Sequence, residues 1–281
     1  MSNFLEKPSL LSRGVYLQLV VDIKLLDDAI IRSNEPEEVL THHYEALGNR
    51  FVIPWRKVKG KLRRLVLEKQ RGYNIQPDCA LKDDLCLQCP SCLLFGGTGE
   101  TSSRKMQYNI LSRVLGETLI STKTVESVKN YTQNAVGEKD LMTGQALMTI
   151  LTVPKETVFK GVVTIKDPTK EMASIVVDNL KRLTRIGARS VEWGRVETSI
   201  VDYKLSDRED ISVYNLLQNQ TQQAAQNNLS SFISDLPAVD TAYTTLNSQI
   251  PDLLKDLIER RSPKKDKKSK TKGEEQGTGE E

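Results

Sequence analysis

The sequence predicts an α+β fold with a ferredoxin-like order of strands and helices. Three observations lead to this prediction: a strand pattern at residues 15–26, helical patterns at 56–71 and 170–185, and further strand patterns between and after these helices. The 281 residues suffice for one elaborated domain or two small ones. With 38% hydrophobic and 27% charged residues, most of the chain is expected to be globular.

The first strand shows a period of two. Its aliphatic face comprises Val15, Leu17, Leu19, Val21, Ile23 and Leu25. The opposite face carries mainly polar side chains, so we expect this strand to be half-buried. The segment that follows, residues 27–50, is acidic and mixed and is interpreted as a loop with a short helical piece.

The first helix is expected at residues 56–71, where apolar side chains recur at helical spacing. These are Val58, Leu62, Leu65 and Val66. Weak alternation over residues 109–121 favours a second strand. Residues 122–144 hold few large apolar side chains and are interpreted as an exposed excursion.

Two strand-like runs, residues 146–153 and 158–165, are joined by Pro-Lys-Glu-Thr and predict a hairpin. A second helix over residues 170–185 places Met172, Val176, Leu180 and Leu183 on one face. A last strand through Val201, Tyr203 and Leu205 completes the order strand, helix, strands, helix, strand.

The composition changes near residue 213, after which Asn and Gln become frequent. Residues 213–261 are predicted to form helices that end at Pro237 and Pro251. Residues 262–281 contain no large apolar side chain and pass from a Lys-rich block to a Glu-rich block, so we expect a disordered tail.

Composition excludes several classes of protein. Net charge +3 does not by itself indicate a nucleic-acid partner, so the distribution of charge decides. No apolar run approaches the roughly 18 residues of a membrane span, and the N-terminus lacks a secretory apolar core. We therefore expect no membrane partner, no disulfide-dense secreted module and no wholly disordered chain.

All four cysteines are crowded into one short segment, with the spacing Cys79-x6-Cys86-x2-Cys89-x2-Cys92. Four soft thiolates suit a closed tetrahedral zinc site that staples the loop, in the reducing cytoplasm. Dense cysteine runs with a Cys-Pro step also occur in iron–sulfur proteins, and four unliganded thiols are the third interpretation. We favour zinc, because nothing else in the chain indicates electron transfer.

The first basic segment, residues 56–71, contains one acidic residue, Glu68. Its cations are Arg56, Lys57, Lys59, Lys61, Arg63, Arg64, Lys69 and Arg71. Such a run is often only a solvated helix face. Here like charges lack i,i+4 partners, and the run begins at a helix N-terminus, where phosphate is favoured. We therefore predict contacts with a phosphate backbone.

The second basic segment interleaves cations with glycine and tryptophan: Lys181, Arg182, Arg185, Gly187, Arg189, Trp193, Gly194 and Arg195. Glycine allows close backbone approach, arginine forks onto phosphate, and tryptophan can stack on a base. A helix C-cap at Gly187 with cations placed against the helix dipole explains the same pattern structurally.

We find no catalytic constellation. Leu94 to Lys105 is rich in glycine and hydroxyl groups but lacks the Gly-Lys-Ser/Thr ending of a Walker A loop. His42 and His43 are adjacent, so they do not face one site. Asp27 and Asp28 follow the first strand and form either a cation site or an exposed turn, of which we favour the turn.

Three motifs in order resemble the RAMP superfamily, the repeat-associated CRISPR proteins. Ile53 to Arg64 (IPWRKVKGKLRR) resembles its first-helix motif, Cys89 to Gly97 (CPSCLLFGG) its Leu-Phe-Gly element, and Arg185 to Glu197 (RIGARSVEWGRVE) its glycine-rich loop. The cysteine insertion before Leu-Phe-Gly is most similar to the backbone subunit of type I-D effectors. The resemblance covers roughly residues 10–205.

The resemblance implies a modified RRM-like palm at residues 10–70 and 93–212, a zinc-bearing insertion at 71–92 and a thumb hairpin at 122–144. The helical segment 213–261 and the tail follow the palm. The resemblance also implies that copies of the chain polymerise in a helical filament along a guide RNA, beside other effector subunits. The guide would select target nucleic acid by base pairing.

The first hypothesis is therefore a non-catalytic guide-RNA-binding backbone. Its candidate RNA contacts are Arg56, Lys57, Lys59, Lys61, Arg63, Arg104, Arg185, Arg189, Trp193 and Arg195. The second hypothesis is an endonuclease of the same superfamily that cuts the paired target through Asp27 or Asp28. The third is a zinc-stapled protein-interaction module that binds no RNA.

Overall fold

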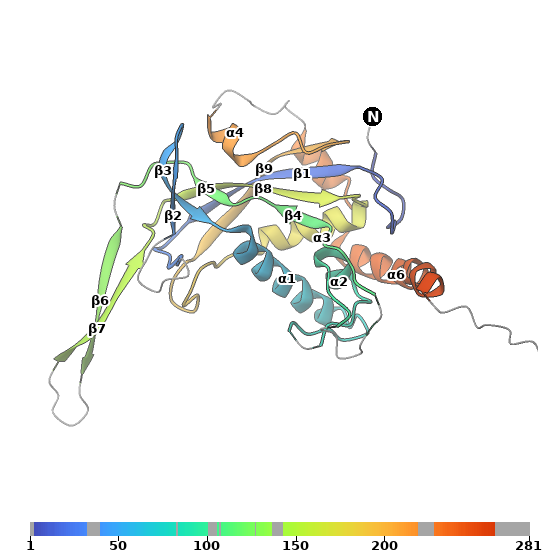
Figure 1. Ribbon diagram of the computed structural model, residues 1–281, viewed down its shortest axis with the longest axis horizontal. Coiled ribbons are helices and arrows are strands. Elements are labelled where there is room, and N and C mark those ends of the chain that lie inside the picture. The colour runs from blue at the N-terminus through green and yellow to red at the C-terminus, as the bar shows by residue number, and fades with distance from the viewer. Residues whose placement is uncertain are drawn as a thin grey trace, which may run out of the picture.

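The computed structural model describes residues 3–32, 40–82, 84–100, 106, 108–126, 128–136, 143–218 and 228–261 (Figure 1). It confirms a mixed α+β fold built on an antiparallel sheet. The strands of this sheet are β1 (Tyr16–Leu25), β2 (Thr41–Tyr44), β3 (Gly48–Ile53), β4 (Val114–Gly116), β5 (Leu119–Ser121), β8 (Val158–Lys166) and β9 (Val196–Ser206). Their order is β2-β3-β5-β8-β1-β9, and β4 also pairs with β8.

The helices are α1 (Trp55–Gly72), α2 (Pro90–Phe95), α3 (Lys170–Lys181), α4 (Val213–Gln218), α5 (Leu229–Ser234) and α6 (Val239–Arg261). The predicted order strand, helix, strands, helix, strand is present, because α1 follows β1 and α3 joins β8 to β9. None of the helices in the described ranges combines the length and hydrophobicity needed to cross a bilayer. The RRM-like assignment and the domain limits given above stay predictions.

β1 lies inside the sheet between β8 and β9. Its aliphatic face is buried as predicted, and Leu17, Leu19 and Ile23 are fully inaccessible. Gln18 on the other face is also buried, because its amide oxygen accepts the backbone N–H groups of Asp210 and Ile211 at 2.7 and 2.9 Å. The segment before α4 thus covers part of the second face of the sheet.

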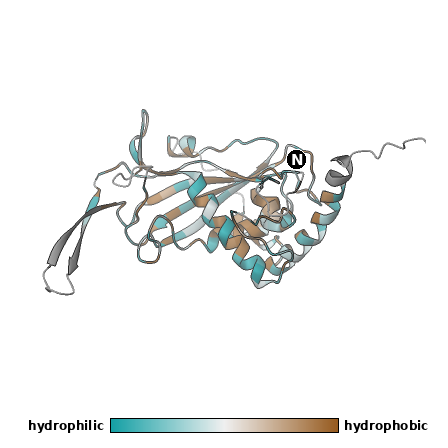
Figure 2. Ribbon diagram, turned by 60° about the horizontal axis from the view of Figure 1, so that its bottom comes forward, coloured by the Kyte–Doolittle hydropathy of each residue, from teal (hydrophilic) through white to brown (hydrophobic). Residues whose placement is uncertain are grey.

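α1, α3 and α6 pack together beside the sheet (Figure 1). The predicted stripe of α3 is confirmed, since Met172, Val176 and Leu180 are all buried. The N-cap of α3 is Thr169, whose hydroxyl accepts the Met172 N–H at 3.3 Å. Strands and helices alternate between hydrophobic and hydrophilic residues (Figure 2), as expected of layers with one buried side.

A second, two-stranded sheet projects from the main one (Figure 1). It pairs β6 (Lys129–Val136) with β7 (Thr143–Thr152). The predicted hairpin between residues 146–153 and 158–165 is therefore wrong. The mainly aliphatic β8 fits the middle of the large sheet, whereas the more polar β6 and β7 pair with each other. The excursion expected over residues 122–144 continues to Thr152, and residues 127 and 137–142 lie outside the described ranges.

Two other expectations fail. Part of segment 27–50 forms the antiparallel pair β2 and β3 rather than a loop with a helical piece, and Gly48 makes the turn with φ of 73°. Pro251 lies inside α6 instead of ending it. The helix tolerates the lost N–H because Tyr243, Leu246 and Ile250 are buried against the core on one side. Residues 262–281 lie outside the description.

Candidate nucleic-acid interface and metal site

The two basic segments meet at one pocket. This pocket has a volume of about 380 Å³ and lies between α1, the glycine loop (residues 185–195) and the chain that follows β1. Its cations are Arg32, Lys57, Lys61, Arg64 and Arg185, and it is completed by Ile30, Ile186, Gly187, Ala188 and Ser190. No acidic side chain lines it among the described residues. The pocket is therefore lined by positive charges without a neighbouring negative charge in its described lining, which suits a polyanion.

α1 contributes three of these cations because of its period. Lys57, Lys61 and Arg64 are spaced i, i+4 and i+7, so they share one face of the helix. The Lys57 ammonium donates to the Arg32 carbonyl at 2.6 Å, which ties the helix to the chain beyond β1. Burial, and then the neighbouring Arg56, lower the pKa of Lys57. The negative charge of an anion in the pocket would act in the opposite direction and favour the charged form of Lys57.

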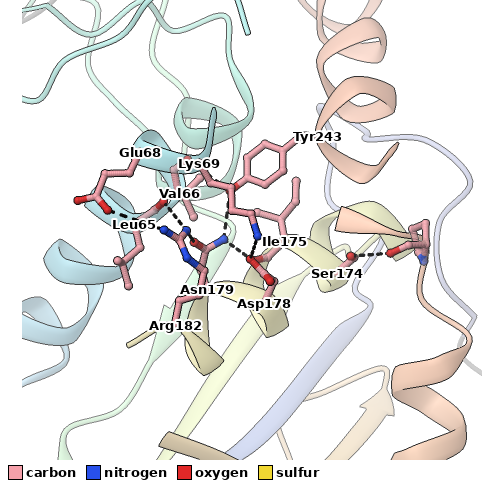
Figure 3. Close-up of polar contacts among 11 residues, drawn as sticks. Leu65, Val66, Glu68, Lys69, Ser174, Ile175, Asp178, Asn179, Arg182 and Tyr243 are labelled. Carbon is pink, nitrogen blue, oxygen red and sulfur yellow. Dashed lines mark hydrogen bonds and ion pairs between the residues drawn. The ribbon is translucent and has the colours of Figure 1, made fainter. Parts of the chain in front are cut away.

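Polar contacts with α3 and α6 hold α1 in place (Figure 3). Three side chains bridge these helices: Lys69 to Asp178 (3.0 Å), Arg182 to the Leu65 carbonyl (3.1 Å) and Tyr243 to the Val66 carbonyl (3.3 Å). They lie on the part of the helix beyond the pocket cations. α1 therefore presents its basic face from a fixed support rather than as a free surface helix.

The glycine loop is closed by its own backbone and anchored beyond β1. The Ile186 N–H donates to the Gly194 carbonyl at 2.8 Å, and the Gly194 N–H donates to the Asp28 carbonyl at 3.0 Å. Gly194 has φ of 74°, and a Cβ there would lie 2.0 Å from the Ile186 carbonyl oxygen. Only glycine fits this position. Within the loop, Arg185 Nη1 donates to the Ser190 carbonyl at 3.0 Å.

The structure brings together only part of the predicted contact set. Lys57, Lys61 and Arg185 line the pocket. The other predicted cations do not line the pocket. Arg56 lies on an exposed turn of α1, and Arg189 and Arg195 lie on exposed parts of the glycine loop. Lys59 and Arg63 also belong to α1 but lie outside the pocket lining. Arg104 lies outside the described residues.

Two pocket cations were missing from the predicted set. Arg64 shares the helical stripe of Lys57 and Lys61, so a count of i, i+4 and i+7 positions finds it. Arg32 stands alone in a segment that reads as acidic, and we find no signal in the sequence that marks it.

Trp193 is packed against the projecting hairpin. Its ring meets that of Tyr131 edge to face, with centroids 4.8 Å apart. Among the described residues its indole N–H is buried and finds no hydrogen-bond acceptor. Trp193 thus joins the glycine loop to the base of β6, a contact that does not present the ring as an open stacking platform.

The exposed turn expected at Asp28 is wrong: Asp28 is buried, with 6% of its surface exposed, and its carboxylate is fully hydrogen-bonded. It accepts hydrogen bonds from Lys129 Nζ (3.1 Å), the Tyr131 hydroxyl and the Lys155 N–H (2.7 Å). Burial raises the pKa of this carboxyl, but the three donors together outweigh burial and hold the pKa below its ordinary value. Asp28 therefore fastens the hairpin to the end of β1. The Asp27 carboxylate accepts the backbone N–H of Arg195.

The four cysteine side chains converge. All are buried, and their sulfur atoms lie within 4.8 Å of one another, with Cys79 and Cys92 3.6 Å apart. Zinc–thiolate bonds of about 2.3 Å in a tetrahedron would separate sulfurs by roughly 3.8 Å. The donor set therefore fits one tetrahedral ion. Crowding also shifts the thiol pKa values in opposite directions, because hydrogen bonds with the other three cysteines lower the pKa of Cys79 and raise that of Cys89.

The backbone and α2 support this cluster. The Cys86 N–H donates to Cys79 Sγ at 3.5 Å, and the Gln88 N–H donates to Cys86 Sγ at 3.4 Å. Such N–H···S bonds favour thiolates, the form that binds a metal. Cys89 is also the N-cap of α2, the helix that carries Cys92.

Comparison with known proteins identifies the family. The profile of the Csc2 CRISPR family matches residues 45–275, most of the chain. The chain belongs to the Csc2 CRISPR family. The crystal structure of Csc2 from Thermofilum pendens is similar, with a TM-score of 0.67 and 18% identity over 94% of this chain and 95% of that chain. No curated protein matches the sequence.

The Csc2 fold extends to other CRISPR assemblies. A chain of a type IV-B CRISPR complex is similar, with a TM-score of 0.51 and 14% identity over 75% of this chain and 100% of that chain. At these identities the likeness concerns the fold alone. The assignment to the Csc2 CRISPR family confirms the CRISPR resemblance inferred from the three sequence motifs.

Proposed function

We propose that this protein is the guide-RNA-binding backbone subunit of a type I-D CRISPR surveillance complex and that it has no catalytic role. Several copies polymerise along one guide RNA in the cytoplasm, beside other effector subunits. The guide RNA is then presented for pairing with target nucleic acid. Head-to-tail contacts between identical subunits produce an open helical filament when the rotation does not close.

The observation that carries this proposal is the meeting of both basic segments at one pocket. Five cations from three parts of the chain line it without an acidic partner among the described residues. Phosphate contacts of this kind position a strand but carry no sequence information. The pocket therefore suits a guide whose sequence differs from one complex to the next, with recognition left to base pairing.

The projecting hairpin β6–β7 is the element we propose as the thumb, on an RRM-like palm. Its base is fixed to the glycine loop by Tyr131 and Trp193 and to β1 by Asp28. These contacts place the hairpin next to the chain that lines the pocket. It is thus suited to interrupt a bound strand at intervals set by the filament.

We propose that the cysteine cluster holds a structural zinc ion. Cys79, Cys86, Cys89 and Cys92 would supply four thiolates, and such a closed set leaves no position for a reacting water. When bound, the ion supplies cross-linking of the loop and no chemistry.

A double substitution in the pocket tests the proposal. We expect Lys61→Ala with Arg185→Ala to weaken binding of the full chain to unrelated single-stranded RNAs by a similar factor. Each phosphate contact contributes about 0.7 to the slope of log K against log salt for single strands, so the slope should flatten by roughly 1.4. Fluorescence anisotropy over a salt series measures both effects.

Arg13→Ala with Lys170→Ala is the charge-matched control. Both side chains are exposed, and Arg13 precedes β1, whereas the pocket lies beyond its other end. The control should keep the affinity and slope of the unsubstituted chain. Equal loss in both double variants would reduce the effect to net charge, and no loss in the pocket variant would refute the RNA-binding role.

A further inference from the structure

A second side of α1, outside the pocket, contacts the cysteine cluster. Arg63 Nη2 lies 3.8 Å from Cys92 Sγ, and the Arg63 Nε is buried without a hydrogen-bond partner among the described residues. Arg64, the next residue, lines the pocket. Adjacent helical positions differ by about 100°, so two neighbouring arginines serve different surfaces.

Other residues of α1 hold the same segment. The Gln70 side-chain oxygen accepts the Ser91 N–H at 3.2 Å, one residue before Cys92. Arg71 Nη2 donates to the Cys79 carbonyl at 2.8 Å. Together with Arg63, these contacts attach α1, from its middle to its C-terminal end, to both ends of the cysteine segment.

Charge explains why an arginine belongs there. Four thiolates around a divalent ion leave a net charge of −2 in a buried site, and a buried charge is costly unless it is paired. Arg63 brings a permanent positive charge to the sulfur of one ligand. A guanidinium also donates N–H groups that a thiolate accepts, and such outer partners tune metal affinity.

We propose that Arg63 is the cationic partner of the metal-bound cysteines and that, through it, metal occupancy sets the position of the N-terminal part of α1, before the residues held by α3 and α6, and so the RNA affinity of the pocket. The second half of this inference rests on the proposed RNA-binding function. In the metal-loaded protein, Arg63 draws α1 toward the cysteine segment, which fixes Lys57, Lys61 and Arg64 relative to Arg32 and Arg185. Without the ion the cysteine side chains are no longer held on one centre, so the contact between Arg63 and Cys92 is no longer fixed.

The pair Arg63→Met and Arg64→Met tests the inference in the full-length chain. We expect Arg63→Met to weaken zinc binding about tenfold or more, measured by competition with a chromogenic chelator. Arg63→Lys, which keeps the charge, should recover part of this loss. Arg64→Met should leave zinc affinity unchanged and weaken binding to an oligouridine strand roughly two- to fivefold.

RNA binding then reports the coupling. Removing zinc from the unsubstituted chain should weaken its binding to oligouridine, and hydrogen exchange in α1 should rise. Because the coupling passes through Arg63, Arg63→Met should bind oligouridine about equally weakly at saturating and at limiting zinc. Circular dichroism at saturating zinc checks that the variant is folded.

The outcomes separate the two proposals. Unchanged zinc affinity in Arg63→Met would overturn the role of Arg63. RNA binding of the unsubstituted chain that does not depend on zinc, or RNA binding of Arg63→Met that still does, would overturn the coupling. If the unsubstituted chain does not bind oligouridine at saturating zinc while Arg63→Met loses zinc affinity, the RNA-binding function fails and the metal role of Arg63 stands.

Discussion

Replacing Cys89 by serine is expected to release the metal and unfold the cysteine segment. Structural zinc sites bind with about 10–16 kcal/mol, comparable to the roughly 5–15 kcal/mol that stabilises a whole domain. The four ligands are themselves among the buried residues of the segment, so loss of the ion leaves the packing of Leu85 and Leu87 and the contacts from α1 to hold it. Thermal unfolding followed by circular dichroism should shift to a lower midpoint, and chelation of the unsubstituted protein should have the same effect.

Ser91→Ala is the matched control for this prediction. Ser91 lies between Cys89 and Cys92, is fully buried, and its hydroxyl has no hydrogen-bond partner among the described residues. Removing it should leave stability unchanged or slightly higher. Elemental analysis should give about one zinc per chain in this control and none in Cys89→Ser. A Cys89→Ser protein that melts like the control would contradict a structural metal.

Asp28→Ala is expected to loosen the hairpin and destabilise the fold. Removing one partner of a buried ion pair costs about 3–5 kcal/mol. Lys129 is 43% exposed, so we expect a smaller loss here, roughly 2–3 kcal/mol. Urea denaturation measures the change in the free energy of unfolding, and hydrogen exchange at residues 129–131 should rise.

The pH dependence of stability provides a second test of the role of Asp28. The folded-state pKa of Asp28 lies below 3.8, its ordinary value. Its carboxylate therefore stabilises the fold fully above about pH 4, and this contribution is lost as the pH falls through the lowered pKa. Asp28→Asn should remove that acid-dependent part while keeping the shape of the side chain. An unchanged stability profile in Asp28→Asn would show that the carboxylate does not fasten the hairpin.

The same position bears on the endonuclease alternative. The Asp28 carboxylate accepts hydrogen bonds from Lys129, Tyr131 and Lys155. The Asp27 carboxylate accepts a backbone N–H of the glycine loop. These contacts give both carboxylates a positioning role. Metal-dependent cleavage of a paired target that disappears in Asp27→Asn with Asp28→Asn, while Asp27→Asn alone stays folded, would support the nuclease instead.

Local patterns predicted much of the fold. The alternation in β1 and the apolar stripes of α1 and α3 correctly indicated their type and buried face, because period alone determines which side chains share a side. The spacing of the four cysteines likewise anticipated their convergence. The basic stripe of Lys57, Lys61 and Arg64 was present in the same periodicity.

Pairing between distant segments could not be read in this way. β8 follows β7 closely in the chain, yet it pairs with β1, β4 and β5, because an aliphatic strand is better buried than placed in a projecting hairpin. Pro251 is a helix breaker by local rules, and tertiary packing of α6 overrides it. Arg63 looked like one more phosphate contact, since the sequence does not show which side of α1 meets the cysteines.

Photocrosslinking of 4-thiouridine-containing RNA to the full chain tests the central claim most directly. We expect mass spectrometry to find crosslinked peptides from both basic segments, residues 55–64 of α1 and residues 185–195 of the glycine loop. Both should appear with RNAs of unrelated sequence. Crosslinks confined to other elements, such as α6 or the exposed edge of β9, would contradict the account.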